Sequence, residues 1–287
     1  MMIKLASVLL LCGWMTSSFA FQEFIPEASA ITKVGTSFVI AGDEEPRSFW
    51  ISENGNDVEK VKVKGAEWDD MEALATVDDT KFFAITSHSF TKKGKQKPER
   101  EQLFLFSKNK KKIEALNSWS LRDAALAYLE KNFSDQLNMK SVRTSSPDDG
   151  GFNIEGMTWH AGHLFLGLRS PVTQKGEAII LVVDNAETNP VITDSIKVNL
   201  GGRGIRSLET HNDELLILSG SPDTTDLTFS VDQFHLGTKT LSKLNIAGFR
   251  DLIRPEGVVV ERPGSLIFVQ DFKEVKNQDI IIHLELR

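Results

Sequence analysis

Two stretches of the chain decide its fold: IEGMTWHAGHLFLGLRSP at residues 154–171 and IRSLETHNDELLILSGSP at residues 205–222. They have equal length, align without a gap and end in the same Ser-Pro. Each reads as a short apolar segment, a polar turn and a stronger apolar segment, which is the pattern of a β-hairpin. The alignment places Glu155 on Arg206 and Arg169 on Gly220.

Three looser copies of this hairpin follow the same plan. They read PEASAITKVGTSFVIAGDE from Pro26, MEALATVDDTKFFAITSHS from Met71 and PEGVVVERPGSLIFVQDF from Pro255. The five copies have their anchor residues at positions 27, 72, 155, 206 and 256, with spacings of 45, 83, 51 and 50. Self-similarity at about 40–50 residues is typical of propeller blades. We therefore predict an all-β fold, a β-propeller of five blades, with six blades as the alternative.

The segments between the hairpins supply the remaining strands of each blade. Apolar runs typical of strands lie at 48–51, 58–63, 102–107, 112–116, 178–183 and 192–200. Only 279–286 follows the last hairpin, so we expect residues 21–25 to add a strand and close the ring, because an open propeller exposes strand edges.

The long 83-residue interval contains the one clear helix pattern, SLRDAALAYLEKNF at residues 120–133. Ser120 is the expected N-cap, with Asp123 as its capping-box partner. We predict a helical insertion at about 118–134 on the propeller rim. A sixth, degenerate blade in this interval is the alternative.

The first 20 residues have the three parts of a secretory signal peptide: Lys4, an apolar run and the small residues around Ala20. We expect one propeller domain at 21–287 in a periplasmic or secreted, monomeric protein. Cleavage would remove Cys12, the only cysteine, and with it any disulfide. The formal net charge of −7 argues against nucleic acid as a partner, and we expect no membrane attachment after cleavage.

The repeat gathers polar residues at one mouth of the propeller channel. In a hairpin, the start of the first strand and the end of the second lie at the same end. Like charges crowded there need arginines, a hard cation or protonation to compensate them. We predict a site for calcium or another divalent cation, because such ions prefer oxygen ligands. Its predicted ligands are Glu27, Glu72, Glu155, Glu256 and Asp271. A purely structural role, locking blade to blade, is the alternative for each glutamate.

Departures from the repeat indicate a small anionic ligand or substrate at the same mouth. Arg206 replaces an anchor glutamate, and a basic loop follows His88. The predicted anion-binding residues are Arg169, Arg203, Arg206, Lys93 and Arg100. His88 and Glu155 are the predicted catalytic residues, acting as acid or base. The turn residues, His160 among them, are expected at the opposite mouth.

Four segments in this order resemble the bacterial domain of unknown function 3616 family: SHSFTKKGKQKPERE, FNIEGMTWHAGHLFLGLRSPV, LGGRGIRSLE and RPEGVVV. The resemblance spans about residues 27–271. The family implies no established activity. More loosely, the chain is similar to secreted propellers named for esterase-like activity of phytase, which implies hydrolysis of an ester or phosphoester.

Two functional hypotheses follow. The chain is either a metal-assisted hydrolase of an anionic substrate or a noncatalytic propeller that binds a ligand or protein. The sequence leaves open whether it is an enzyme.

Overall fold

The computed structural model describes residues 25–43, 45–53, 55, 57–222, 228–272 and 280–286. The predicted leader at 1–20 lies outside these residues, as do residues 21–24 of the predicted closing strand, and Ile25 is not in a strand. Within the described part of the chain, no helix has both the length and the apolar character needed to cross a membrane.

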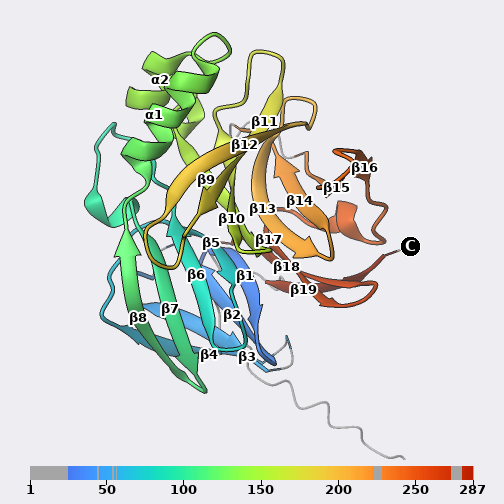
Figure 1. The fold of residues 1–287 in the computed structure, drawn as a ribbon. Helices are drawn as coiled ribbons and strands as arrows, with labels where there is room; N and C mark the ends of the chain where they lie inside the picture. The colour runs from blue at the N-terminus through green and yellow to red at the C-terminus, as the bar shows by residue number, and fades with distance from the viewer. Residues whose placement is uncertain are drawn as a thin grey trace, which may run out of the picture.

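The strands form five radial groups of antiparallel strands (Figure 1). The first group is β1 (Ala28–Val34), β2 (Ser37–Gly42), β3 (Ser48–Ser52) and β4 (Glu59–Lys64). The second is β5 (Met71–Thr76), β6 (Lys81–Thr86), β7 (Leu103–Asn109) and β8 (Lys112–Trp119). The third is β9 (Asn153–His160), β10 (His163–Ser170), β11 (Glu177–Asp184) and β12 (Val191–Asn199). The fourth is β13 (Gly204–His211), β14 (Glu214–Gly220), β15 (Ser230–His235) and β16 (Leu241–Lys243). The fifth is β17 (Pro255–Arg262), β18 (Ser265–Gln270) and β19 (Ile281–Glu285).

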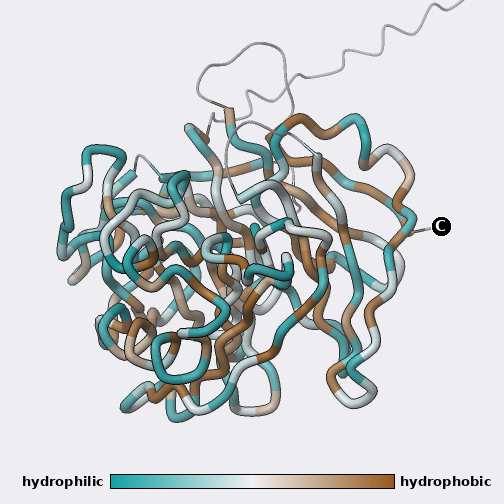
Figure 2. Tube along the Cα trace, turned by 90° about the horizontal axis from the view of Figure 1, so that it is seen from above, coloured by the Kyte–Doolittle hydropathy of each residue, from teal (hydrophilic) through white to brown (hydrophobic). Residues whose placement is uncertain are grey.

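The first strand of each group lies at the centre of the molecule. β1, β5, β9, β13 and β17 contact one another in this order, and β17 returns to β1, so the inner strands make a closed ring. The buried apolar side chains form five clusters, each between two neighbouring groups. In Figure 2, hydrophobic segments lie along the strands, whereas the connecting loops are mostly hydrophilic. The chain is a β-propeller, as the repeat predicts.

The first two groups share one sheet, which the sequence did not predict. Their outer strands β4 and β8 pair in parallel, with Val63 opposite Ile113 and Lys64 opposite Glu114. The pairing covers part of two outer edges that would otherwise present unpaired backbone N–H and C=O groups there. The fifth group has three described strands, and an isolated bridge from Ile246 to Leu286 continues its outer edge.

The long interval contains helices α1 (Arg122–Phe133) and α2 (Met139–Thr144), so its described residues supply no sixth group. The predicted cap at Ser120 is wrong: α1 begins two residues later, and its N-cap is Leu121 without a side-chain hydrogen bond. Burial of Leu121, Leu126 and Leu129 against the second and third groups fixes the helix instead. Short 3-10 helices lie at η1 (Pro98–Arg100), η2 (Pro147–Asp149) and η3 (Phe249–Asp251).

Candidate functional site

One cavity of about 640 Å³ opens where the inner strands begin. Its wall includes the five anchor residues of the repeat: Glu27, Glu72, Glu155, Arg206 and Glu256. Hairpin register explains this convergence, because Ala28 lies opposite Gly42, Met71 opposite Thr86 and Pro255 opposite Gln270. We call this space the central cavity. The repeat predicts this meeting of five distant segments.

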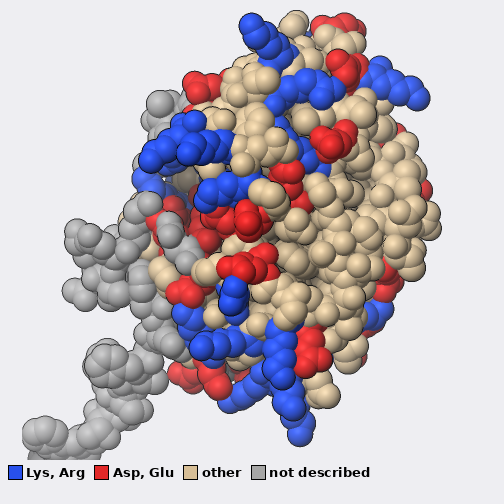
Figure 3. All heavy atoms as spheres, turned by 90° about the vertical axis from the view of Figure 1, so that its left-hand side faces the viewer, with Lys and Arg blue, Asp and Glu red and all other residues tan. Residues whose placement is uncertain are grey.

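The central cavity is net negative. Nine acidic and six basic residues line it, which is a formal excess of three negative charges when every carboxyl group is ionised. Figure 3 shows acidic side chains gathered in a hollow with basic side chains on either side. A wall with this balance attracts a cation more strongly than an anion.

On one side of the cavity the charges are paired. Arg169 Nη1 donates to Glu155 Oε1 at 2.8 Å, and Arg206 Nη1 lies 3.1 Å from Glu155 Oε2. The same Arg206 nitrogen donates to both carboxylate oxygens of Glu256, at 2.9 and 3.0 Å. Asn153 also donates to Glu155 Oε1, at 2.9 Å. We call Glu155, Arg169, Arg206 and Glu256 the paired half of the cavity.

Glu155 and Glu256 of the paired half have pKa values that are shifted in opposite directions. Burial opposes ionisation of Glu155, but Arg169 and Arg206 outweigh it and hold its pKa below the usual value. Burial raises the pKa of Glu256 to about 7, although Arg206 opposes the rise. Glu155 is therefore ionised at neutral pH, whereas Glu256 exchanges its proton there.

The other side of the cavity is an acidic half made of Asp43, Asp70 and Glu72. One carboxylate oxygen from each lies within 4.8 Å of the others. Asp43 follows β2, Glu72 is the second residue of β5, and Asp70 precedes that strand with a left-handed φ of 65°. Arg100 of the loop between β6 and β7 pairs with Asp70. Among the described residues, Asp43 and Glu72 take part in no ion pair.

The acidic half is under-compensated. Burial and neighbouring carboxylates raise the pKa of Glu72 and of Asp43 well above their usual values, and a Ser29 hydrogen bond opposes the rise at Asp43. Burial also raises the pKa of Asp70, and Arg100 opposes it. Asp43 Oδ1 is buried and has no hydrogen-bond partner among the described residues. Closely spaced carboxylate oxygens with one oxygen unsatisfied fit a hard divalent cation.

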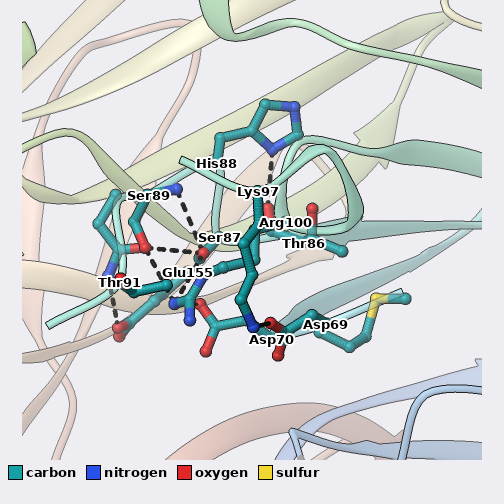
Figure 4. A network of polar contacts seen from close by, with 12 residues as sticks. Asp69, Asp70, Thr86, Ser87, His88, Ser89, Thr91, Lys97, Arg100 and Glu155 are labelled. Atoms are coloured by element: carbon teal, nitrogen blue, oxygen red, sulfur yellow. Dashed lines mark hydrogen bonds and ion pairs between the residues drawn. The ribbon is translucent and has the colours of Figure 1, made fainter. Parts of the chain in front are cut away.

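The structure places His88 outside the central cavity, so the predicted position at its mouth is wrong. Nδ1 donates to the carbonyl oxygen of Thr86 at 2.8 Å, and Nε2 accepts from the backbone N–H of Leu121 at 3.3 Å. Burial lowers the pKa of His88 to about 4, which keeps the ring neutral. Figure 4 shows the ring directed away from Asp70 and Glu155. With both ring nitrogens engaged, His88 fastens the β6–β7 loop to the helical insertion.

Two of the predicted anion-binding residues also do not line the cavity. Arg203 donates from Nε to Ser219 Oγ at 3.1 Å, and Lys93 is exposed on the β6–β7 loop. Lys92 and Lys97 of that loop do line the cavity, and Lys97 pairs with Asp69 at 2.6 Å. Arg100, Arg169 and Arg206 lie in the wall as expected, but each is bonded to a carboxylate.

The five predicted metal ligands do not form one cluster either. Of the predicted ligands, only Glu72 belongs to the cluster of closely spaced oxygens. Arginines engage Glu155 and Glu256, and Arg254 lies 3.5 Å from Asp271. Glu27 lines the cavity, and its backbone N–H donates to Phe272 O. Asp43 and Asp70 were not among the predicted ligands. For Asp70 the available signal was the Asp-Asp pair directly before Met71, and for Asp43 it was the position at the end of the first hairpin copy.

A sequence profile of a protein family described as "Protein of unknown function (DUF3616)" matches residues 59–248. No curated protein sequence matches the chain significantly.

Several solved structures are similar in fold. A GH43 β-1,3-galactosidase with galactodeoxynojirimycin has 10% identity and a TM-score of 0.52, over 90% of each chain. The PQQ-bound aldose sugar dehydrogenase of Streptomyces coelicolor has 10% identity and a TM-score of 0.50, over 93% of this chain and 96% of that one. The Neurospora crassa Pan2 WD40 domain has 12% identity and a TM-score of 0.41, over 84% of this chain and 57% of that one. Likeness at this identity concerns the fold alone.

Proposed function

The chain belongs to the DUF3616 family of proteins of unknown function, and we propose that its central cavity binds a divalent cation and hydrolyses an anionic ester or phosphoester. The observation that carries the proposal is the acidic half, where oxygens of Asp43, Asp70 and Glu72 lie within 4.8 Å of one another. Such a cluster needs positive charge, and Arg100 pairs with only one of the three carboxylates.

The cation also accounts for an anionic substrate in a negative cavity. The arginines of the wall already bond carboxylates, so they offer little free charge to a ligand. A divalent cation on the acidic half would bind a phosphate or carboxylate oxygen and polarise the bond to be cleaved. Lys92, which lines the cavity from the β6–β7 loop, adds positive charge near the entrance.

Glu256 is the residue best suited to move the proton. Its pKa of about 7 makes it a base and an acid at neutral pH. As a base it takes a proton from water, whose oxygen adds to the carbonyl carbon or the phosphorus. The bond from that atom to the leaving oxygen breaks, and the leaving oxygen receives the proton back from Glu256. Arg206 holds the carboxylate in place through both oxygens.

Glu155 has a different role. Its lowered pKa keeps it ionised, and it lies between Arg169 and Arg206. It therefore positions the two arginines rather than exchanging a proton, which revises the predicted acid or base role.

Hydrolysis of nitrophenyl esters, phosphoesters and a lactone, with calcium, magnesium or manganese, tests the proposal. Glu256→Gln keeps the shape of the side chain and is expected to lower the turnover rate about 100-fold or more. Asp135→Asn, an exposed change in the segment between α1 and α2, is the matched control and should retain full activity. A nitrophenyl β-galactoside belongs in the panel because one similar fold is that of a galactosidase.

The noncatalytic alternative makes a different prediction. If the cavity only binds a ligand, calorimetry detects binding of the cation with phosphate, and no substrate is turned over. Activity that stays unchanged in Glu256→Gln would overturn the assignment of Glu256.

A further inference from the structure

A second cavity of about 400 Å³ lies at the opposite ends of the inner strands. Each inner strand contributes to it near its C-terminal end. Its wall includes Thr32 of β1, Thr76 of β5, Thr158 of β9, Thr210 of β13 and Val260 of β17. Four of the five copies of the repeat thus place a threonine there, although the proposed hydrolase uses none of them.

Each of these four threonines donates its hydroxyl proton in a hydrogen bond within the protein. Thr76 Oγ1 donates to the carbonyl oxygen of Lys33 at 2.6 Å, so Thr32 Oγ1 must donate the proton in its 2.9 Å bond to Thr76. Likewise Thr210 Oγ1 donates to the Trp159 carbonyl, and Thr158 Oγ1 bonds Thr210 Oγ1 as the donor. A hydroxyl has one proton and two lone pairs. Thr32 and Thr158 therefore present acceptor lone pairs alone to any ligand.

Glu209 brings a carboxyl group into the same cavity. It lies in β13 next to Thr210 and forms no ion pair with a basic side chain of the described residues. Burial raises its pKa to about 8, opposed only by a backbone hydrogen bond from Thr210. A desolvated carboxyl group among acceptor oxygens lacks a positively charged partner.

The charged and titratable neighbours do not supply that partner. Lys33 Nζ donates to the carbonyl oxygen of Glu261 at 2.9 Å and lies 5.6 Å from the centre of the Phe38 ring. His160 Nε2 lies 3.4 Å from Asp213. His211 also lines the cavity, and among the described residues no ion pair joins it to Glu209.

We propose that the second cavity is a site for a monovalent cation, held by the Glu209 carboxylate and by the hydroxyl oxygens of the threonines that share the cavity. One carboxylate balances one positive charge, whereas a divalent ion would leave an uncompensated charge in a desolvated space. The site is separate from the acidic half and does not depend on the proposed hydrolase.

The melting temperature of the purified protein tests this site. The buffer contains EDTA to keep divalent ions off the acidic half, and its pH lies above the Glu209 pKa of about 8. Potassium, sodium and ammonium chloride, each at about 100 mM, are compared with choline chloride, because the alkyl groups on the choline nitrogen keep carboxylate and hydroxyl oxygens away from its charge. At about ten times the dissociation constant, the small cation that fits should raise the melting temperature by about 3 °C or more.

The variant Glu209→Gln should lose this shift, whereas Glu72→Gln, at the other end of the channel, should keep it. Equal melting temperatures in all four salts would overturn the proposal, as would an undiminished shift in Glu209→Gln. If that variant does not fold, anomalous diffraction from wild-type crystals soaked in thallium(I) acetate decides instead. A peak beside Glu209 is expected, and no peak in the cavity would refute the site.

Discussion

The two halves of the central cavity start from the same repeat and end with opposite electrostatics. In the paired half, Arg206 occupies an anchor position and bonds both Glu155 and Glu256. In the acidic half, the anchor Glu72 has two aspartates beside it, and Arg100 reaches only Asp70. The repeat brings carboxylates together everywhere, and single departures from it decide where they are neutralised. The acidic half, where Arg100 neutralises only one of three carboxylates, is therefore the half in which we expect a bound cation.

The largest expected effect comes from breaking the paired half. Arg206→Met removes a buried guanidinium and leaves Glu155 and Glu256 without it, which should lower the free energy of unfolding by about 3–5 kcal/mol. The melting temperature should fall by about 10 °C. Arg262→Met is the control, because Arg262 pairs with Glu285 at 2.6 Å where both side chains are more than half exposed. If both variants lose a similar amount of unfolding free energy, Arg206 stabilises the protein no more than an exposed ion pair does.

Glu72→Gln, a change in the acidic half, should change the free energy of unfolding relative to wild type in opposite directions with and without a divalent ion. Burial and Asp43 raise the pKa of the Glu72 carboxyl group, which means that its ionised form is unfavourable in the folded protein. Without divalent ions, Glu72→Gln should therefore have a free energy of unfolding equal to or higher than that of wild type. With calcium at about 100 times its dissociation constant, wild type should gain about 2.7 kcal/mol in unfolding free energy. The variant should gain almost nothing. Thermal unfolding with EDTA or calcium measures both, and an equal calcium gain would exclude Glu72 as a ligand.

The stability of the metal-free protein should depend on pH. Asp43, Glu72 and Glu256 have raised pKa values, so the folded protein holds protons that the unfolded chain releases above the ordinary pKa values of 3.8 for aspartate and 4.5 for glutamate. The stability from these protons is fully present below those ordinary values and is lost as pH rises through the pKa values of the folded state, about 7 for Glu256. Urea unfolding from pH 5 to 8 should show a falling free energy. Glu256→Gln should flatten the part of the curve up to about pH 7, and an unchanged slope would contradict the shift at Glu256.

The smallest effect is expected at Lys93, which is exposed and does not line the cavity. Lys93→Gln should change the unfolding free energy by less than about 0.5 kcal/mol and leave phosphate binding unchanged. Lys92→Gln, the matched change one residue earlier at the cavity wall, should weaken phosphate binding in calorimetry. If Lys93→Gln weakens binding as much, the loop acts through its total charge rather than through one contact.

The repeat predicted the propeller and the meeting of its anchors, because the apolar pattern and the turn length, which set hairpin register, are both visible in the sequence. It did not predict the joined sheet, since the pairing of β4 with β8 depends on how neighbouring groups lie in space. The helical pattern at residues 120–133 predicted α1 but not its N-cap. Tertiary packing, rather than a side-chain hydrogen bond from Ser120, determines where the helix begins.

The errors in the site have a conformational cause. His88 lies two residues after the end of β6, where its φ of 55° belongs to a left-handed turn, and its ring accepts a hydrogen bond from the backbone of Leu121 in the insertion. Asp70 joins the site through a similar turn that no repeat position encodes. Glu155 and Glu256 looked like metal ligands because the sequence does not show which carboxylates Arg206 reaches.

The position of a bound divalent ion tests the central claim most directly. Crystals soaked in manganese(II) chloride give an anomalous signal that locates the metal without assumptions about its ligands. The account predicts one peak in the central cavity, about 2–2.5 Å from oxygens of Asp43, Asp70 and Glu72. A peak between Glu155 and Glu256, or a central cavity that takes up no manganese, would contradict it.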